Sequence, residues 1–496
     1  MGPGLALRAI REWVESESCS DDASTMTERM TKFVGLAAAP PQTRAPDKRR
    51  GDFDEIQLRF VADRAAAQAS RCAQCGVPFC QNACPLHNNI PDWLRLTAEG
   101  RTEEAYQLAA ATNSMPEICG RICPQDRLCE GDCVIEQSGH GAVTIGAVEK
   151  YLTETAWDNG WVGALRVGAP RTESIGIIGA GPAGLAAAES LRERGYKVTV
   201  YDRYDRAGGL LVYGIPHFKL EKDVVARRVQ RLTEGGVAFE LKCDVGADVA
   251  FADIRARHDA LLVATGVYKA RPLRVPSAGA ALAALDYLTA ANRAALGDAH
   301  DEAPAKGKNV VVIGGGDTAM DCVRTAVRQG AASVTCLYRR DRENMPGSQR
   351  EVKYAEEEGV RFDWLAAPKA IVGGASPSVK AVRMRLGVRD ASGRAAPEEV
   401  DGSDYALPAD LVIAALGFDP EDLPALWNTP NLDTTNWGTL AVDKSFATSL
   451  PGVFAAGDIV RGASLVVWAI REGRDAANGV HAYLQERAAL ARVAAE

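Results

Sequence analysis

The hydrophobic pattern divides the chain into a helical part and an α/β part. Between about residues 52 and 165 the apolar side chains recur at helical spacing, as at Trp93, Leu94 and Leu96, and no alternating strand pattern interrupts them. From Ser174 onward, short apolar runs alternate with longer amphipathic segments, which is typical of parallel strands connected by helices. The pattern therefore predicts an all-α domain followed by an α/β region.

The α/β region contains the same strand–glycine–helix–strand unit twice, about 135 residues apart. In the first copy the predicted elements are a strand over Ile175–Ile178, a helix ending at Arg194 and a strand over Val198–Tyr201. In the second copy they are a strand over Val310–Ile313, a glycine turn at Gly314–Gly316, a helix over Thr318–Arg328 and a strand over Ser333–Tyr338. Two such units predict two nucleotide-binding domains.

The first glycine turn has the spacing of a dinucleotide-binding loop. Gly179 permits the tight turn, Gly181 lets a pyrophosphate approach the backbone, and Gly184, just after Ala183, lets helix and strand pack closely. The phosphates would lie at the helix N-terminus. Asp202 ends the second strand, where a carboxylate accepts a hydrogen bond from a ribose hydroxyl. A chance glycine turn is the weaker alternative, because strand, helix and acid occur in order.

The second turn differs from the first in the residue that would meet the ribose. Gly314, Gly316 and Ala319 keep the loop pattern, and Asp317 and Thr318 open its helix. Where the acid is expected, the chain has Arg339 and Arg340. Guanidinium groups match the 2′-phosphate of NADP, so this copy favours NADPH over NADH. The alternative is a solvated basic turn.

Two further stretches support a flavin at the first turn. Thr265-Gly266 follows an apolar strand, Gly457-Asp458 follows another, and both resemble motifs of the flavoproteins with two dinucleotide-binding domains. That resemblance implies that Asp458 binds the ribityl chain and that the helix starting near Ser464 points its N-terminus at the isoalloxazine ring, where its dipole stabilises negative charge. We expect one FAD and one NADPH, and we name no catalytic acid, base or nucleophile, because hydride transfer needs positioning.

Eight of the twelve cysteines fall in two runs, each with a proline directly after one cysteine. The runs are Cys72, Cys75, Cys80 and Cys84, and Cys119, Cys123, Cys129 and Cys133. Such runs are typical of ferredoxin-type [4Fe–4S] clusters, and we expect two clusters. Paired zinc sites are the alternative, which the loose spacings disfavour, because zinc knuckles usually show two tight C-x2-C pairs.

In ferredoxins with two clusters the fourth cysteine of a run binds the other cluster. Cys133 would then join Cys72, Cys75 and Cys80, and Cys84 would join Cys123 and Cys129. Cys119 and an oxygen ligand compete for the remaining position. Dihydropyrimidine dehydrogenase, which has a similar cysteine pattern, uses a glutamine sixteen residues after the last cysteine. The resemblance implies Glu149 at this position, slightly ahead of Cys119.

Composition narrows the choice of partner and compartment. The 496 residues carry a net charge of −8, which disfavours nucleic acid and anionic membranes as partners. No apolar run reaches the roughly 20 residues of a membrane-spanning helix, and no secretory leader is evident. Without a leader we expect a reducing, cytoplasmic location, where metal ligation by the dense cysteines is favoured over disulfides. Residues 1–45 read as a tail, with Met26 as a second plausible start.

The whole arrangement resembles the small (β) subunits of NADPH-dependent glutamate synthase, over about residues 26–485. The supporting stretches are Cys72–Cys80, Ile118–Cys129, Gly208–Pro216, which includes Gly209, and Asn344–Ser348. The resemblance implies an electron-input subunit whose partner is a large (α) subunit carrying FMN and glutaminase activity. That partner makes L-glutamate from L-glutamine and 2-oxoglutarate.

The expected domains follow from these motifs. They are an N-terminal tail (1–45), a helical domain with two [4Fe–4S] clusters (46–165), an FAD-binding domain in two parts (166–305 and 441–496) and an NADPH-binding domain (306–440). Two other functions stay open on the sequence: a stand-alone ferredoxin–NADP oxidoreductase of similar build, and a non-enzymatic iron–sulfur scaffold.

Overall fold

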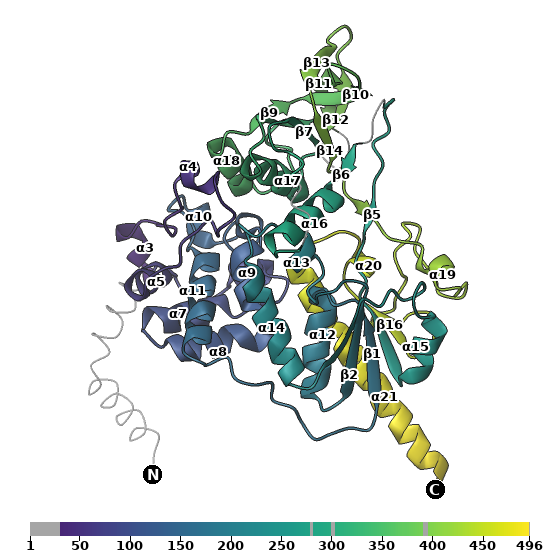
Figure 1. The fold of residues 1–496 in the computed structure, drawn as a ribbon. Helices are drawn as coiled ribbons and strands as arrows, with labels where there is room; N and C mark the ends of the chain where they lie inside the picture. Colours follow the sequence, from purple (N-terminus) through teal and green to yellow (C-terminus); the bar gives the residue numbers. More distant parts are fainter. Residues whose placement is uncertain (1–29, 278–280, 299–302, 390–394, 496) are drawn as a thin grey trace, which may run out of the picture. The chain divides into compact units, whose positions relative to one another are not determined.

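The computed structural model describes residues 30–277, 281–298, 303–389 and 395–495 (Figure 1). The described chain forms two compact units. The helical unit comprises the residues up to Pro41 together with Arg59–Thr112 and Gln125–Trp161. The sheet unit comprises Gln42–Leu58, Asn113–Pro124 and the chain from Val162 onward.

The helical unit consists of helices joined by short loops. Its elements are α3 (Lys32–Gly35), α5 (Ala62–Ala69), α6 (Phe79–Ala83), α7 (Ile90–Ala98), α8 (Thr102–Thr112), the 3-10 turn η1 (Gln125–Arg127), α10 (Val134–Gln137) and α11 (Ile145–Asp158). Trp93 and Leu94 of α7 and Leu152 of α11 are buried at its centre, and the Trp93 indole N–H donates to Asn88 Oδ1 at 2.9 Å. The predicted all-α domain is confirmed.

The part of the expected tail that is described is bound into this unit. The fully buried Arg71 donates hydrogen bonds to the carbonyl oxygens of Leu36, His140 and Ala142. A guanidinium group can satisfy several buried carbonyls at once because its five donors form a rigid fork. Residues 36–41 are therefore held in place, in contrast to the expected tail, whereas residues 1–29 lie outside the described residues.

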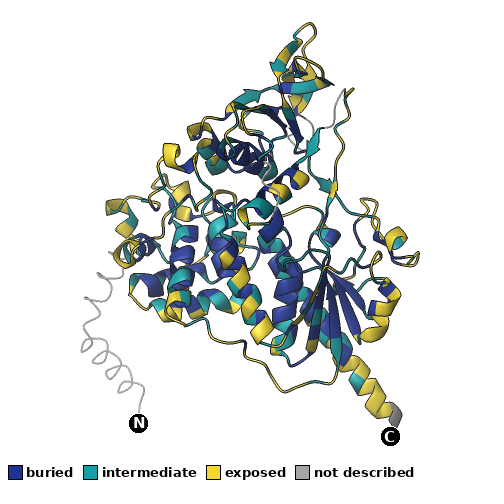
Figure 2. Cartoon of the chain, in the orientation of Figure 1, coloured by how far each residue is buried: buried dark blue, intermediate teal, exposed yellow. Residues whose placement is uncertain are grey.

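The first sheet of the sheet unit is parallel throughout. Its strands are β1 (Ser174–Ile178), β2 (Lys197–Asp202), β3 (Ala238–Leu241), β4 (Ala260–Val263) and β16 (Val453–Ala455), in the order β16-β4-β1-β2-β3. Figure 2 shows these strands mostly in the colour of buried residues. The helices of this part are α12 (Pro182–Glu193), α13 (Leu210–Tyr213), α14 (Lys222–Glu234), α15 (Phe251–Arg257), α20 (Asp458–Arg461) and α21 (Val466–Ala495).

The second sheet repeats this plan. Its strands are β6 (Leu282–Ala283), β7 (Asn309–Ile313), β8 (Ser333–Tyr338), β9 (Arg361–Trp364) and β14 (Leu411–Ala414), in the order β6-β14-β7-β8-β9, all parallel. The accompanying helices are α16 (Ala284–Ala295), α17 (Asp317–Arg328) and α18 (Gln349–Glu357). Two parallel sheets in one unit confirm the predicted fold class.

The remaining elements connect or extend the two sheets. They are α4 (Pro46–Arg49), α9 (Pro116–Ile122), α19 (Leu423–Leu426), the antiparallel strands β10 (Ala366–Val372), β11 (Ser378–Arg389), β12 (Ala395–Glu399) and β13 (Tyr405–Pro408), and the pair β5 (Lys269–Ala270) and β15 (Phe418–Asp419).

Three segments are placed differently from the expected domain bounds. The strand β6 and the helix α16 precede residue 306, yet β6 pairs with β14 in the second sheet. Residues 42–58 and 113–124 lie in the sheet unit, although most of them belong to the expected helical domain. Short or isolated segments such as these carry too little periodicity to be assigned from the sequence.

Candidate functional site

The first glycine turn lies at the carboxyl edge of the first sheet, directly after β1. Gly179 has a φ of +110°, and a Cβ there would lie 2.3 Å from the Ala264 carbonyl oxygen. A Cβ on Gly184 would lie 1.9 Å from the Gly179 oxygen, so only glycine lets α12 approach the turn. By contrast, a Cβ on Gly181 would meet nothing within 4 Å, which leaves room for a ligand.

Asp202 closes the turn from the neighbouring strand β2. Its carboxylate accepts hydrogen bonds from the backbone N–H of Ala180 at 2.6 Å and of Tyr204 at 2.8 Å. Burial raises the pKa of Asp202, and the two N–H donors act against that rise. The residue thus faces the glycine turn, as a ribose-binding acid must.

Asp458 lies at the third strand end of the same edge, after β16. Burial raises its pKa, while the Ser464 hydroxyl, which donates to Asp458 Oδ1 at 2.9 Å, lowers it. Gly457 has a φ of +79°, and its N–H donates to Glu472 of α21 at 3.0 Å. Glu472 was not predicted from the sequence, because only the fold brings it to this turn.

A cavity of about 260 Å³ lies in front of this edge. The predicted residues that line it share a position at a strand end or a helix start: Gly179, Gly181, Ala183, Asp202, Thr265, Gly266, Asp317, Thr318, Gly457 and Asp458. The Thr265 hydroxyl is buried in this wall, and it has no hydrogen-bond partner among the residues that the structure describes. An unpaired buried hydroxyl beside an open glycine turn fits a polar ligand such as FAD.

The second glycine turn reproduces the first. Gly314, after β7, has a φ of +146°, and a Cβ there would lie 2.2 Å from the Ala415 oxygen, whereas Gly316 is open. The Asp317 carboxylate accepts from the Ser348 N–H at 2.9 Å, which holds the 344–348 segment over the turn. Ala319, in α17, is fully buried. The geometry fits a second dinucleotide.

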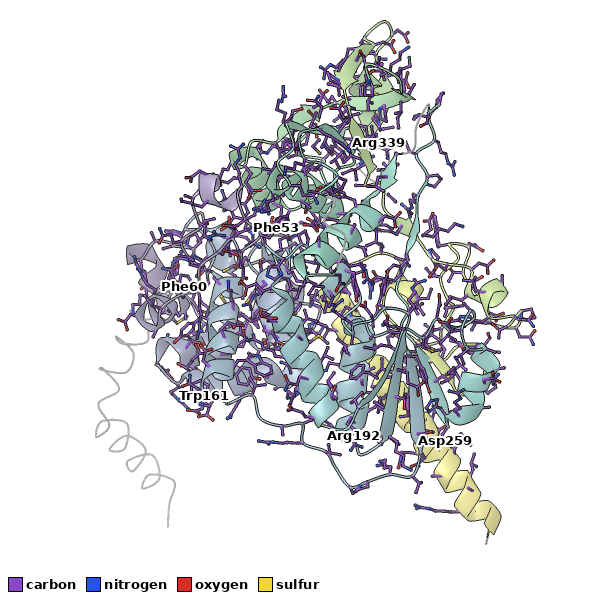
Figure 3. The ribbon with its side chains drawn as sticks, in the orientation of Figure 1. Phe53, Phe60, Trp161, Arg192, Asp259 and Arg339 are labelled. Atoms are coloured by element: carbon purple, nitrogen blue, oxygen red, sulfur yellow. The ribbon has the colours of Figure 1, made fainter. Side chains whose placement is uncertain are left out.

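Arg339 and Arg340 directly follow β8 (Figure 3). Arg339 is exposed and Arg340 is half-buried. In the part of the chain that the structure describes, neither guanidinium forms an ion pair with a carboxylate, and the Arg340 Nε has no hydrogen-bond partner. Two unneutralised arginines at the end of the second strand fit a 2′-phosphate.

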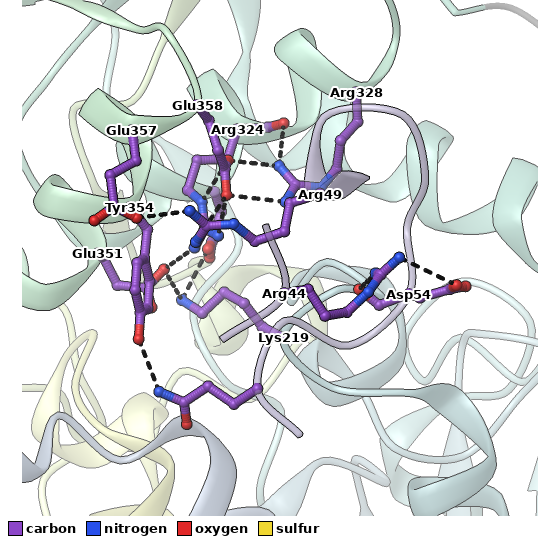
Figure 4. Close-up of polar contacts among 12 residues, drawn as sticks. Arg44, Arg49, Asp54, Lys219, Arg324, Arg328, Glu351, Tyr354, Glu357 and Glu358 are labelled. Atoms are coloured by element: carbon purple, nitrogen blue, oxygen red, sulfur yellow. Dashed lines mark hydrogen bonds and ion pairs between the residues drawn. The ribbon is translucent and has the colours of Figure 1, made fainter. Parts of the chain in front are cut away.

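A buried ionic network, which the sequence did not reveal, connects the two nucleotide-binding parts (Figure 4). Lys219 lies 2.8 Å from Asp321 of α17 and 3.6 Å from Glu351 of α18. Burial raises the pKa of Asp321 to about 6, although the Lys219 charge acts against that rise. For Glu351 the charges of Lys219 and Arg324 outweigh burial, and they lower the pKa to about 2. All three residues line the cavity.

The same network includes a segment that precedes the cysteines. Arg49 of α4 is buried and pairs with Glu357 at 2.6 Å, and Arg324 and Arg328 bind Glu358 at 2.8 and 2.7 Å (Figure 4). Burial and paired charges make this cluster rigid, because removal of one partner leaves an uncompensated buried charge. Residues 42–58 are thereby attached to the second nucleotide-binding part.

Lys222 holds another wall of the cavity. This buried lysine donates hydrogen bonds to the carbonyl oxygens of Leu211, at 3.0 Å, and Ile215, and both residues line the cavity. Burial lowers the pKa of Lys222 to about 7. Gly209, just before this segment, has a φ of +53°, and a Cβ there would lie 2.9 Å from Gly181 Cα.

The Lys222 pKa predicts a pH dependence of stability. Between pH 7 and 10.5 the unfolded chain holds a proton on this lysine that the folded chain lacks, so this group makes stability rise with pH. We expect Lys222→Met to remove that contribution. The free energy of unfolding should be measured from pH 7 to 9 for both proteins. The wild-type value should rise with pH relative to that of the variant. A constant difference would contradict the assignment.

The cysteines of the helical unit form two groups. Cys72, Cys75, Cys80 and Cys133 line one small pocket. Burial raises the pKa of Cys72 to about 11 and of Cys80 to about 12, and Cys133 adds to both shifts. For Cys129 burial raises the pKa, and the charges of Cys84 and Glu149 add to the rise. All eight cysteines of the two runs are free of disulfides. Four thiols around one pocket fit a cubane cluster.

Cys119 and Cys123 belong to the sheet unit. Cys119 is buried in α9, and Cys123 caps the carboxyl end of this helix, where its N–H donates to the Cys119 oxygen at 3.2 Å. Both line the 260 Å³ cavity together with the first glycine turn. The sequence did not indicate that these cysteines would border the first glycine turn, because the two segments lie about 60 residues apart.

Comparison with known proteins assigns both parts. Residues 49–161 match the family model described as dihydropyrimidine dehydrogenase domain II, 4Fe-4S cluster, and residues 173–473 match pyridine nucleotide-disulphide oxidoreductase. The chain is 61% identical over 485 residues to the glutamate synthase [NADPH] small chain of Azospirillum brasilense, covering 95% of this chain and 99% of that one. The chain belongs to the glutamate synthase small-chain family.

A more distant member of the family supports this assignment. The glutamate synthase [NADPH] small chain of Escherichia coli K12 is 45% identical over 473 residues, covering 93% of this chain and 100% of that one. Among solved structures, Mycobacterium tuberculosis FprA in complex with NADPH matches with a TM-score of 0.54 at 20% identity, covering 65% of this chain and 86% of that chain, which shows a shared fold.

The two family matches agree with the two kinds of site, the glycine turns and the groups of cysteines. As a member of this small-chain family, the chain is an electron-transferring flavoprotein with an FAD/NAD(P)-binding region and a 4Fe-4S domain. Among the described residues, no helix is long and apolar enough to span a bilayer.

Proposed function

We propose that this chain is the electron-input subunit of glutamate synthase. In this proposal it oxidises NADPH at FAD and passes electrons through two [4Fe–4S] clusters to a large subunit carrying FMN and glutaminase activity. That subunit forms L-glutamate from L-glutamine and 2-oxoglutarate. The names of the relatives, which are NADPH-dependent glutamate synthase small chains, support the choice of donor and reaction.

One observation supports this proposal most strongly. The cavity of about 260 Å³ is bordered by Gly181 of the first turn, by Thr318 of the second and by Cys123 of the cysteine-bearing helix. A hydride donor, a flavin and an electron acceptor would therefore meet at one place. When bound, FAD accepts a hydride from NADPH and releases single electrons to the clusters.

The chain's own residues bind and orient these groups. We assign the pyrophosphate of FAD to Gly179, Gly181 and the start of α12, and its adenosine ribose to Asp202. Asp458 would bind the ribityl chain, and the N-terminus of α21 would stabilise negative charge on the ring. No acid or base is assigned, because these residues position reactants.

The second turn would hold NADPH in the corresponding way. Gly314, Gly316 and the start of α17 would bind its pyrophosphate. Arg339 and Arg340 would bind the 2′-phosphate, and Lys219 with Asp321 would keep the two nucleotide-binding parts together.

The cluster ligands follow the two groups of cysteines. We assign Cys72, Cys75, Cys80 and Cys133 to one cluster, which agrees with their shared pocket. Cys84, Cys123 and Cys129 would bind the other. Glu149 is favoured over Cys119 as its fourth ligand, because the Glu149 charge acts on Cys129. The free thiols favour a reducing compartment, and we propose the cytoplasm.

Co-expression with a candidate large subunit tests the function. The two chains should copurify, and NADPH with glutamine and 2-oxoglutarate should yield glutamate. Neither chain alone should sustain this turnover with NADPH. Failure to copurify, together with ferredoxin-dependent NADPH oxidation by the chain alone, would favour the stand-alone oxidoreductase instead.

Asp202→Ala should weaken FAD retention. Loss of a buried carboxylate that accepts two N–H groups and, in this proposal, a ribose hydroxyl costs about 1–3 kcal/mol, or about 5- to 150-fold in affinity. Flavin content after gel filtration measures the effect, with Asp253→Ala, an exposed acid of α15, as the control. Equal flavin content in both variants would contradict the role of Asp202.

A further inference from the structure

A buried ion pair attaches the cysteine-bearing helix α9 to the FAD-binding part. Arg228 of α14 donates from Nε to Glu117 Oε1 at 2.8 Å and from Nη2 to Glu117 Oε2 at 2.9 Å. Glu117 is fully buried, and the Arg228 side chain is 4% exposed. Figure 1 shows α9 and α14 as neighbours within the sheet unit.

The same arginine also faces the helix that begins at the first glycine turn. Arg228 Nη1 lies 3.8 Å from Glu189 of α12, and Arg231, one turn further along α14, pairs with that carboxylate at 2.5 Å. Arg228 therefore lies between α12, which carries the proposed pyrophosphate site at its start, and α9, which carries Cys119 and Cys123.

A second ion pair fixes the other end of α9. Arg121 donates from Nε to Glu55 at 2.9 Å and from Nη1 to the Glu117 carbonyl oxygen at 3.0 Å. Its side chain is 3% exposed, and the residue lines the cavity. The short helix α9 is thus held from two sides by charged groups that are largely buried.

A bidentate arginine–carboxylate pair fixes geometry more than it adds stability. Buried ion pairs can often be replaced by apolar residues without loss of stability, because desolvation offsets the attraction. The planar fork nevertheless allows only a narrow range of relative positions for its two partners. Such a pair is suited to a site whose function depends on the distance between two helices.

We propose that Glu117 and Arg228 are positioning residues that set the distance between the flavin and the cluster bound at Cys123. This inference rests on the proposed function, since it needs FAD in the cavity and a cluster at Cys123. Electron transfer between fixed centres falls steeply with distance. A small displacement of α9 should therefore slow the transfer from flavin to cluster, while the transfer from NADPH to flavin is unchanged.

Arg228→Lys tests this, because lysine keeps the charge and loses the fork. We expect the rate of cluster reduction by NADPH to fall about tenfold, as measured by rapid-freeze EPR of the complex. Flavin content and flavin bleaching by NADPH should stay within about twofold of the wild type. Arg231→Lys, on the same helix, is the matched control and should change neither step, because Arg231 binds Glu189 and the Gly163 carbonyl oxygen rather than α9.

Two outcomes would overturn the proposal. One is wild-type cluster reduction in Arg228→Lys. The other is a parallel loss of flavin and of bleaching, which would make the pair a general support of the fold. If the lysine variant does not fold, Glu117→Gln, which keeps the shape of the acceptor, carries the same test. Absence of cluster reduction in the wild type would instead refute the proposed function.

Discussion

Cys75→Ala is expected to abolish NADPH-dependent glutamate formation by the two-subunit complex, with a loss of about 100-fold or more. Cys75 shares its pocket with Cys72, Cys80 and Cys133, and without its thiolate the proposed cluster would lack one of four ligands. Reduction of a dye by NADPH should persist. The cavity of about 260 Å³, where we propose the flavin binds, is lined by the sheet unit, whereas Cys75 belongs to the helical unit.

The control for this experiment is Cys322→Ala. Cys322 is fully buried in α17 and lies outside both cysteine runs. Its replacement should leave glutamate formation and dye reduction close to the wild type. Unchanged glutamate formation in Cys75→Ala would remove this cysteine from the electron path, and loss of the dye reaction as well would indicate general unfolding.

Replacement of both Arg339 and Arg340 by alanine is expected to raise the KM for NADPH about 10- to 100-fold. Charge-assisted hydrogen bonds are worth about 1.5–3 kcal/mol, and this pair would supply them only to the 2′-phosphate. The KM for NADH should change little, because NADH lacks that phosphate. Steady-state dye reduction with each nucleotide measures the two KM values and their ratio.

Arg342→Ala is the matched control for these arginines. Arg342 lies in the same turn and is exposed, but it forms an ion pair with Glu356 at 2.8 Å. Its replacement should leave both KM values near the wild type. If Arg339 and Arg340 affected NADH and NADPH equally, they would serve the fold of the turn rather than the phosphate.

The strand–turn–helix units were predictable because their glycines report backbone constraints directly. The expected strand over Ile175–Ile178 and helix ending at Arg194 agree with β1 and α12 within one residue at the predicted ends. Gly179 and Gly314 follow their strands with positive φ, and backbone carbonyls exclude any Cβ at both positions. Such local requirements leave a clear trace in the sequence.

Long-range pairs leave no such trace. Glu117 and Arg228 are 111 residues apart, and Lys219 and Asp321 are 102 residues apart, so no local spacing indicates that they meet. Gly473 is another example. A Cβ there would lie 2.1 Å from the Ala183 oxygen, because α21 crosses the start of α12 closely. In the sequence it is one glycine within a long helix.

The positions of the cysteines in the fold could be predicted only in part. The runs indicate which thiols share a cluster, and the pocket containing Cys72, Cys75, Cys80 and Cys133 agrees with that grouping. The sequence could not show that Cys119 and Cys123 border the same 260 Å³ cavity as the first glycine turn. That arrangement depends on the fold of α9 against α14.

The most direct test of the account is anaerobic reconstitution of the chain, followed by reduction with NADPH. We expect about eight iron and eight sulfide per chain, one FAD, and an EPR signal from reduced clusters after NADPH is added. With the large subunit and its substrates present, that signal should decay as glutamate forms. A preparation that holds zinc in place of iron and sulfide, or lacks flavin, would contradict the account.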